Sequence, residues 1–427
     1  MSTMSLPGAA AGECPQCGGD VRLDAGDPLL ICPFCRTRLY MTVSGPLKYI
    51  LSRNGMGCDR PDGVVYLPYW RFRGLKYRVL EGGNVEGGFL DTTVGCHKAE
   101  RFFPGLGIRP GVGRLRLAAG NAGLVSPARS ADEALSLAER RIEHLKKVRP
   151  LFHRFIGENQ YLLYSPYRLT KNGRGGFSLQ DLWDGSTLRE IPEKTGRLFS
   201  RAAKGGTVEN VRFLSLVCPE CSASLIASAG AVILICRRCY RAWRAEGAGF
   251  LEFRYTVLRP DSVPAGADRF LPFWQVMLTV SGLPFKNRAD FRSAIISYQR
   301  PPESWKKQPV CLYIPAFKLS PRVFLRVSGN MSLACLEGQQ EEARLRRDEQ
   351  AEAVRLPVRE AAQAVKVILA HLLKKRRKLY EMVPGSRLKI RRAELVFFPF
   401  RSRQGELVDM ISGQAVPANA LELGRKI

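Results

Sequence analysis

The amino-acid sequence predicts an α+β fold built from two similar halves, and three observations carry this prediction. Two sets of four cysteines, Cys14 to Cys35 and Cys218 to Cys239, have identical spacing and an offset of 204 residues. Short runs of β-branched and aromatic residues, punctuated by Gly and Pro, predict several strands after each set. Apolar residues at helical spacing predict an amphipathic helix in each half. The shared order of elements predicts an internal duplication, with about 200 residues per unit.

Each cysteine set contains two CxxC motifs separated by fourteen residues. A CxxC turn directs two thiolates toward one side, and a hairpin of about a dozen residues brings the second turn opposite the first. Four thiolates suit a tetrahedral ion, so we expect two bound ions per chain, with Zn²⁺ as the expected metal. The predicted ligands are Cys14, Cys17, Cys32, Cys35, Cys218, Cys221, Cys236 and Cys239.

These two segments resemble the zinc-ribbon superfamily. Its members are commonly small β modules of nucleic-acid machinery, and others contact proteins or stabilise a fold. The resemblance implies one zinc-stabilised module at residues 1–43 and a second at residues 214–245. Three of the four turns depart from the usual CPxCG form, because Arg36, Ser222 and Tyr240 stand where Gly18 stands in the first turn.

The remainder of each half follows its cysteine set. We expect an α+β domain at residues 44–195, a linker containing Gly and Lys at 196–213, and a second α+β domain at 246–427. In the first half, Ser130 and Glu133 form a capping box that predicts a helix ending near Val148.

The second half is expected to contain a longer helical region, from about Glu337 to Met382, with a break near Pro357. Its stretch at residues 341–355 mixes charges of both signs, which is typical of a solvated helix.

A Pro-aromatic-Trp motif occurs in both halves, ending at Trp70 and at Trp274, again with an offset of 204 residues. Features common to both halves are those that the fold itself requires. We therefore expect both tryptophans in core strands, with each indole N–H bonded to a partner. Base-stacking platforms on a nucleic-acid surface are the alternative.

The formal charge of +27 and a pI near 10.0 predict attraction to polyanions. Nucleic acid, an anionic membrane face and an acidic protein surface are the candidate partners, and a basic protein without such a partner is the alternative. Basic residues present in one half only are the best candidates for a specific contact.

The first such group is Arg71, Arg73, Lys76 and Arg78, which alternate with aromatic residues. Strand periodicity places Arg71 and Arg73 on the face opposite Trp70, where they could follow a phosphate backbone. A solvated edge strand protected by charge is the alternative.

Two further basic groups are candidates for nucleic-acid binding. One run, near a helix end, could contact phosphates or acidic lipid headgroups, or complement the helix dipole. The other surrounds the second cysteine set, where arginine could equally offset thiolate charge. The residues of these groups are Lys374, Lys375, Arg376, Arg377 and Lys378, and then Arg237, Arg238 and Arg241.

Signatures of catalysis are weak in this sequence. The four histidines are dispersed, and the neighbours Cys96 and His97 seldom form a nucleophile and base in such an arrangement. Closed four-cysteine sites also lack the open position that hydrolytic zinc chemistry requires. We therefore expect a non-enzymatic protein.

Three functions are consistent with this expectation. The leading hypothesis is nucleic-acid binding through basic surfaces, with little sequence specificity. The alternative is a protein-interaction scaffold in a larger complex, with zinc purely structural, and a peripheral membrane role is weaker. A rubredoxin-like iron electron carrier is a remote further alternative, because four thiolates also accept iron.

Compartment predictions rest on the cysteines and on the apolar runs. Thiols used for metal fit a reducing compartment. The sequence shows neither a signal peptide nor an apolar run of the 18 or more residues expected of a transmembrane helix. A cytoplasmic location is therefore expected.

Overall fold

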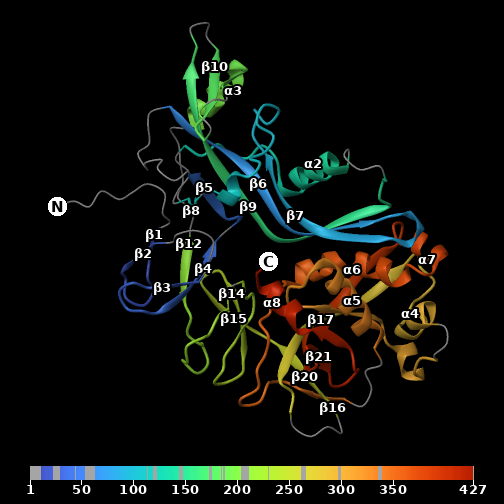
Figure 1. The fold of residues 1–427 in the computed structure, drawn as a ribbon. Coiled ribbons are helices and arrows are strands. Elements are labelled where there is room, and N and C mark those ends of the chain that lie inside the picture. The colour runs from blue at the N-terminus through green and yellow to red at the C-terminus, as the bar shows by residue number, and fades with distance from the viewer. Residues whose placement is uncertain are drawn as a thin grey trace.

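The computed structural model describes residues 11–22, 29–43, 45–52, 63–112, 114–118, 123–143, 148–172, 176–183, 185, 188–202, 211–228, 230–260, 266–296, 300–334 and 339–426. These residues fold as mixed α and β structure, with two seven-stranded sheets and several smaller ones (Figure 1).

The first sheet is centred on two long antiparallel strands, β6 (Val64–Val79) and β9 (Phe152–Lys171). β7 (Val85–Gly95) pairs with the other edge of β6, and β5 (Lys48–Ser52) runs parallel to β9. The remaining strands are β8 (Arg114–Leu117), β10 (Phe177–Asp181) and β11 (Leu188–Ile191).

The second sheet has the same order of pairing. β17 (Arg269–Ser281) lies between β18 (Val310–Pro315) and β20 (Arg387–Arg403), as β6 lies between β7 and β9. β16 (Tyr255–Pro260) runs parallel to β20, as β5 does to β9. The remaining strands are β19 (Gln339–Glu342), β21 (Glu406–Asp409) and β22 (Ala415–Pro417).

The two tryptophans of the shared motif lie in the central strands β6 and β17. Trp70 is 6% exposed and its indole donates to the carbonyl of Arg129 at 3.1 Å. Trp274 is 2% exposed and donates to the carbonyl of Leu356 at 2.8 Å. The prediction of buried, bonded indoles in core strands is therefore confirmed.

Helices of the second half lie between the two sheets (Figure 1). Apolar side chains of β6, including Leu75 and Val79, belong to the same core as the second sheet and its helices. Tyr77 donates to the carbonyl of Pro321 at 3.1 Å, and buried Tyr380 donates to the carbonyl of Leu80 at 2.6 Å. The two halves are therefore packed together through a shared core.

The helices vary in length and position. They are α1 (Arg109–Val112), α2 (Ala131–Glu143), α3 (Glu193–Ala202), α4 (Arg288–Ile295), α5 (Pro321–Leu333), α6 (Val358–Leu373), α7 (Arg377–Met382) and α8 (Ala418–Lys426), with 3₁₀ turns η1 (Glu81–Gly83) and η2 (Glu303–Lys307). The predicted capping box starts α2, because Glu133 N donates to Ser130 Oγ at 3.3 Å and Ser130 N donates to Glu133 Oε2 at 2.8 Å.

The prediction of a helix from about Glu337 is wrong for the first part of that range. Residues 339–342 form β19, which pairs with β16, and helix α6 begins at Val358. The mixed charges suit a helix, yet they form ion pairs that hold this segment against the edge of the sheet. Of the expected linker, 196–202 lies in α3 and 211–213 lies in a strand, whereas 203–210 lies outside the described residues.

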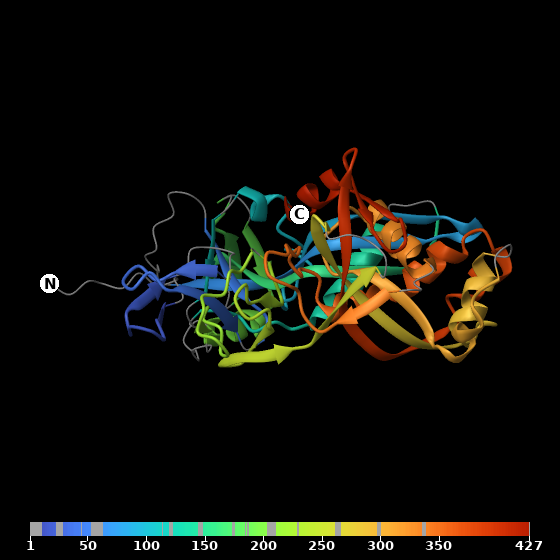
Figure 2. The ribbon, with the colours of Figure 1, turned by 90° about the horizontal axis from the view of Figure 1, so that it is seen from below.

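The two cysteine sets lie in small sheets at one end of the molecule, far from α4 and α7 (Figures 1 and 2). β12 pairs with β4 of the first set, although it directly precedes the second set in the sequence. The strands are β1 (Ala11–Glu13), β2 (Asp20–Arg22), β3 (Leu29–Ile31), β4 (Arg38–Val43), β12 (Val211–Ser215), β13 (Leu234–Ile235), β14 (Ala242–Glu246) and β15 (Gly249–Phe253).

Candidate metal centres

All four CxxC turns have the same backbone geometry. In each turn the fourth residue after the first cysteine donates its N–H to that cysteine's carbonyl, as Gly18 does to Cys14 at 2.8 Å and Tyr240 does to Cys236 at 2.9 Å. This residue has a positive φ in every turn: 72° for Gly18, 62° for Arg36, 57° for Ser222 and 58° for Tyr240. Three of the four turns therefore hold a non-glycine residue in the left-handed region.

The turns bring the eight predicted ligands into two groups of four. We call Cys14, Cys17, Cys32 and Cys35 site 1, and Cys218, Cys221, Cys236 and Cys239 site 2. Within each site all sulfur atoms lie within 4.8 Å of one another.

The sulfur separations fit a tetrahedral ion. The Cys14 to Cys35 and Cys17 to Cys32 Sγ distances in site 1 are both 3.7 Å. The two corresponding Sγ distances in site 2 are both 3.6 Å. Tetrahedral bonds of about 2.3 Å to sulfur would place the sulfurs about 3.8 Å apart. The two sites can therefore hold two metal ions, as the spacing predicts.

The surroundings of Cys35 favour its thiolate form. Thr37 Oγ1 lies 3.2 Å from Cys35 Sγ, and this contact, with the Thr37 backbone, lowers the pKa of Cys35 to about 6. In site 2 the N–H of Arg238 donates to Cys236 Sγ at 3.4 Å. Cys17 and Cys35 are exposed, whereas their counterparts Cys221 and Cys239 are half-buried. Site 2 is therefore the more enclosed of the two.

A tyrosine connects site 2 to the second sheet. Tyr255 donates its hydroxyl to the carbonyl of Tyr240 at 2.6 Å and accepts the N–H of Leu345 at 3.2 Å. Burial raises the pKa of Tyr255 to about 12, which keeps the hydroxyl proton available for donation. Through Tyr255, the left-handed turn residue of site 2 is held by the segment that follows β19.

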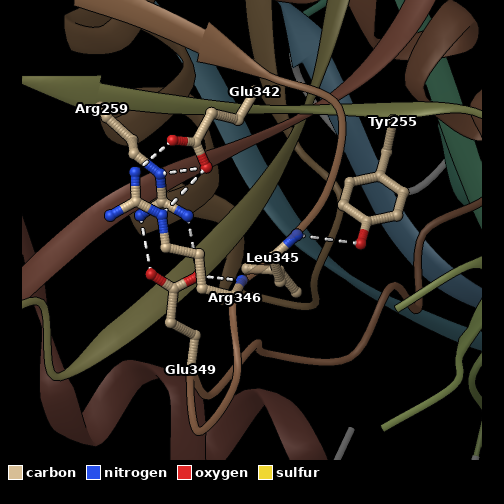
Figure 3. Close-up of polar contacts among 6 residues, drawn as sticks. All are labelled: Tyr255, Arg259, Glu342, Leu345, Arg346 and Glu349. Carbon is tan, nitrogen blue, oxygen red and sulfur yellow. Dashed lines mark hydrogen bonds and ion pairs between the residues drawn. The ribbon is translucent and has the colours of Figure 1, made fainter. Parts of the chain in front are cut away.

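That segment is fixed by an arginine network (Figure 3). Arg259 on β16 contacts Glu342 at 2.7 Å and Glu349 at 2.7 Å. Arg346 donates its N–H to Glu349 at 2.7 Å and also bonds Glu342. Glu342, Arg346 and Glu349 are therefore part of the support of site 2.

The two sites form one structural unit. Thr42 at the end of β4 donates to the carbonyl of Gly247 at 2.9 Å. Leu29 and Tyr40, from the first cysteine set, pack against an apolar cluster that contains Cys218 and Cys236. Because β12 pairs with β4 and leads into Cys218, the backbone of site 1 also supports site 2.

The basic group on β6 is largely internal. Arg71 and Arg78 are buried and pair with Asp91 and Glu86, each at 2.8 Å. Lys76 is also buried, and only Arg73 of the four is exposed.

The predicted alternation of side chains along β6 is correct. Trp70 and Phe72 pack in one cluster with side chains of α2, and Arg71 lies on the other face, beside Tyr161. Helices cover both faces of the sheet, however, so three of these cations do not form an accessible surface. The edge-strand alternative is wrong, because β6 pairs on both sides.

The other two predicted groups of basic residues lie far apart from each other. Lys374, Lys375, Arg377 and Lys378 are exposed around the start of α7, and half-buried Arg376 donates to the carbonyl of Ile295 at 3.4 Å. Arg237 and Arg238 are exposed beside site 2 at the other end of the molecule, whereas Arg241 pairs with Glu220 at 2.7 Å.

Sequence reasoning missed a continuation of the Lys374 run. The first part of β20 carries four exposed cations, and the alternating pattern from Arg387 to Arg392 was a signal for a basic strand. We call residues 374–392 the basic segment; it contains nine Lys and Arg residues and one carboxylate, Glu381. The four additional cations are Arg387, Lys389, Arg391 and Arg392.

Neither the membrane-helix criterion nor comparison with known proteins points to a specific function. The helices of the described part of the chain include none with the length and apolar character to cross a membrane. No protein-family model, curated protein or solved structure matches the chain.

Proposed function

We propose that this chain is a non-enzymatic nucleic-acid-binding protein in which two zinc ions have a structural role. The exposed basic segment is the observation that carries the proposal. In the described structure, Arg377 pairs with Glu381 and Arg392 with Glu394, whereas the exposed cations Lys374, Lys375 and Lys378 form no ion pair. Cations without such partners are available to neutralise phosphates, and this contact does not depend on base sequence.

We propose zinc because all eight candidate donors are cysteine sulfurs in closed groups of four, which is the usual structural zinc set. Zinc in such a site has no open position for substrate, which favours a structural role over catalysis. Iron in the same ligands is the alternative, and metal analysis of untagged protein distinguishes the two.

We also propose that the two halves arose by duplication. The matching cysteine spacing, the matching order of strand pairing and the matching indole bonds support this idea. On this view the basic strand that follows the helix is the better candidate for a specific contact, because cations near a helix end also occur in the first half, at Lys146, Lys147 and Arg149.

Binding of a single-stranded oligonucleotide, followed by fluorescence anisotropy across a salt series, tests the proposed function. Replacing Lys374, Lys375 and Lys378 by Gln should lower the slope of log K against log salt by roughly 2 to 3. The control replaces Arg189 and Lys194, exposed cations on β11 and α3, by Gln and should leave the slope within about one unit of wild type. An affinity that is indifferent to salt in the wild-type protein would refute the proposal.

A protein-interaction scaffold is the second candidate. It is favoured by apolar side chains left exposed at site 1, where Phe34 is 66% and Ile31 is 56% exposed. Such residues are common in protein contacts. A partner that remains bound after nuclease treatment, and is lost in Phe34→Ala, would support this function over nucleic-acid binding.

A further inference from the structure

The two cysteine sites differ in how they are attached to the sheet of their own half. At site 2, Val232 donates its N–H to the carbonyl of Val354 at 2.9 Å, beside a β-bridge between Ile233 and Val354. The same segment is bonded to the central strand β17, because Phe270 donates its N–H to the carbonyl of Gln350 at 2.7 Å. Backbone hydrogen bonds therefore run from site 2 into the middle of the second sheet.

The first half contains the corresponding segment, at residues 123–129, without this attachment. The segment is bonded to the central strand β6 in the same way, because Tyr66 donates its N–H to the carbonyl of Gly123 at 2.9 Å. Residues 126–129 are exposed, and among the described residues no hydrogen bond joins them to site 1. Site 1 is therefore detached from the sheet of its own half.

The tyrosine that holds site 2 also has no equivalent at site 1. Tyr255 is the first residue of β16 and bonds the carbonyl of the turn residue Tyr240 and the N–H of Leu345 (Figure 3). Lys48 is the first residue of β5, which runs parallel to β9 as β16 does to β20. Lys48 has no phenol to bond the corresponding turn residue, Arg36.

The strands around the two sites differ in their origin. At site 2, β14 pairs with β13 and β15, which lie next to it in the sequence. At site 1, β4 pairs with β3 and with β12, which follows only after the whole first α+β domain. Pairing with a distant strand closes a longer loop and costs more entropy. Cys17 and Cys35 are also exposed, whereas Cys221 and Cys239 are half-buried, so site 1 should open more readily.

We propose that site 1 exchanges its metal ion with the surroundings whereas site 2 retains its ion. Site 1 then makes the contact between the two sites responsive to metal supply. Without an ion to hold its turns together, β4 releases β12, and Leu29 and Tyr40 leave the apolar cluster that contains Cys218 and Cys236. The inference goes beyond the proposed function, because it gives the two ions different roles and requires no nucleic acid.

Release of Zn²⁺ to excess EDTA, followed with a chromogenic chelator, tests the difference between the sites. Wild-type protein loaded with two equivalents should release them in two phases of one equivalent each, the first at least about tenfold faster. Cys17→Ser should show only the slow phase, and Cys221→Ser only the fast one. A single phase in the wild type, or the slow phase in Cys221→Ser, would overturn the proposal.

Tyr255→Phe tests the cause of the slow phase. The change leaves the carbonyl of Tyr240 without its donor and should speed the slow phase by about two- to tenfold. Tyr77→Phe is the matched control, because it also removes a bond to a carbonyl, that of Pro321, but where the two halves meet. It should leave both phases unchanged. The assignment of the phases by the two cysteine variants does not depend on the folding of Tyr255→Phe.

Limited trypsin digestion tests the structural consequence. After the first equivalent has left, cleavage should appear after Arg38 on β4 and Arg212 on β12, whereas Arg244 on β14 of site 2 stays protected. All three arginines are exposed in the intact protein, so protection reports on the strands that contain them. Equally fast cleavage after Arg244 would contradict the proposal. Nucleic acid takes no part in these measurements, so their failure is distinct from failure of the proposed function.

Discussion

Ser222→Gly should tighten metal binding at site 2. Ser222 is exposed and has a φ of 57°, so its side chain is held in a region that glycine enters freely. Ser224 is also exposed, but its backbone forms a β-bridge with Val217, in the extended conformation that any residue adopts. The same Ser to Gly change at these two positions therefore isolates the effect of φ.

The magnitude follows from two opposing terms. Relief of the left-handed strain is worth about 1–2 kcal/mol, and the added freedom of glycine in the unfolded chain costs about 0.5–1 kcal/mol. The net gain of about 0.5–1 kcal/mol corresponds to about two- to fivefold tighter metal binding, because the metal binds as the turn folds. Ser224→Gly has only the entropic cost and should weaken binding by about two- to fivefold.

Competition with a chromogenic chelator measures these affinities. A Cys17→Ser background removes one ligand of site 1, so that the titration reports on site 2. The two variants should differ by about tenfold in Kd. If both change Kd in the same direction and by the same factor, the positive φ of Ser222 carries no strain and the reasoning is refuted.

Three further outcomes are expected. Metal analysis of Cys14→Ser or Cys218→Ser should give one ion per chain, since each site loses on the order of 10 kcal/mol of folding free energy with its metal; two ions per chain would contradict the assignment. Tyr380→Phe should lower the free energy of unfolding by about 1–3 kcal/mol in urea titrations, because it removes the buried hydroxyl bond to the carbonyl of Leu80. Burial lowers the pKa of His97 from 6.5 to about 3, so the unfolded chain takes up a proton first as the pH falls. Stability should therefore be lost between about pH 6.5 and pH 3, and His97→Phe should reduce this loss in acid titrations followed by fluorescence.

Local patterns in the sequence predicted local structure well. CxxC spacing determines the position of two sulfurs on one turn, so the two groups of four cysteines that could bind metal were predicted before any fold was known. The same holds for the capping box at Ser130 and for the buried Trp70 and Trp274, because each depends on neighbours in the chain or on a repeated motif.

Features decided by distant segments could not be predicted. Alternation along β6 gave the correct face for Arg71, but it contains no information that helices cover both faces of the sheet. The charges at residues 341–355 fit a helix in isolation, and only the presence of Arg259 on β16 explains why Glu342 and Glu349 lie against a sheet edge.

The pairing of β12 with β4 limits when the first half of the chain can finish folding during synthesis. At roughly 5–20 residues per second, the ribosome needs on the order of 10–30 s between the end of β4 at Val43 and the start of β12 at Val211. For that time β4 has one unpaired edge. The side chains of Leu75 and Tyr77 remain uncovered for longer, because the helices that pack against them belong to the second half. The nascent first half therefore exposes a strand edge and an apolar sheet face, and its final structure is reached only when the second half has left the ribosome.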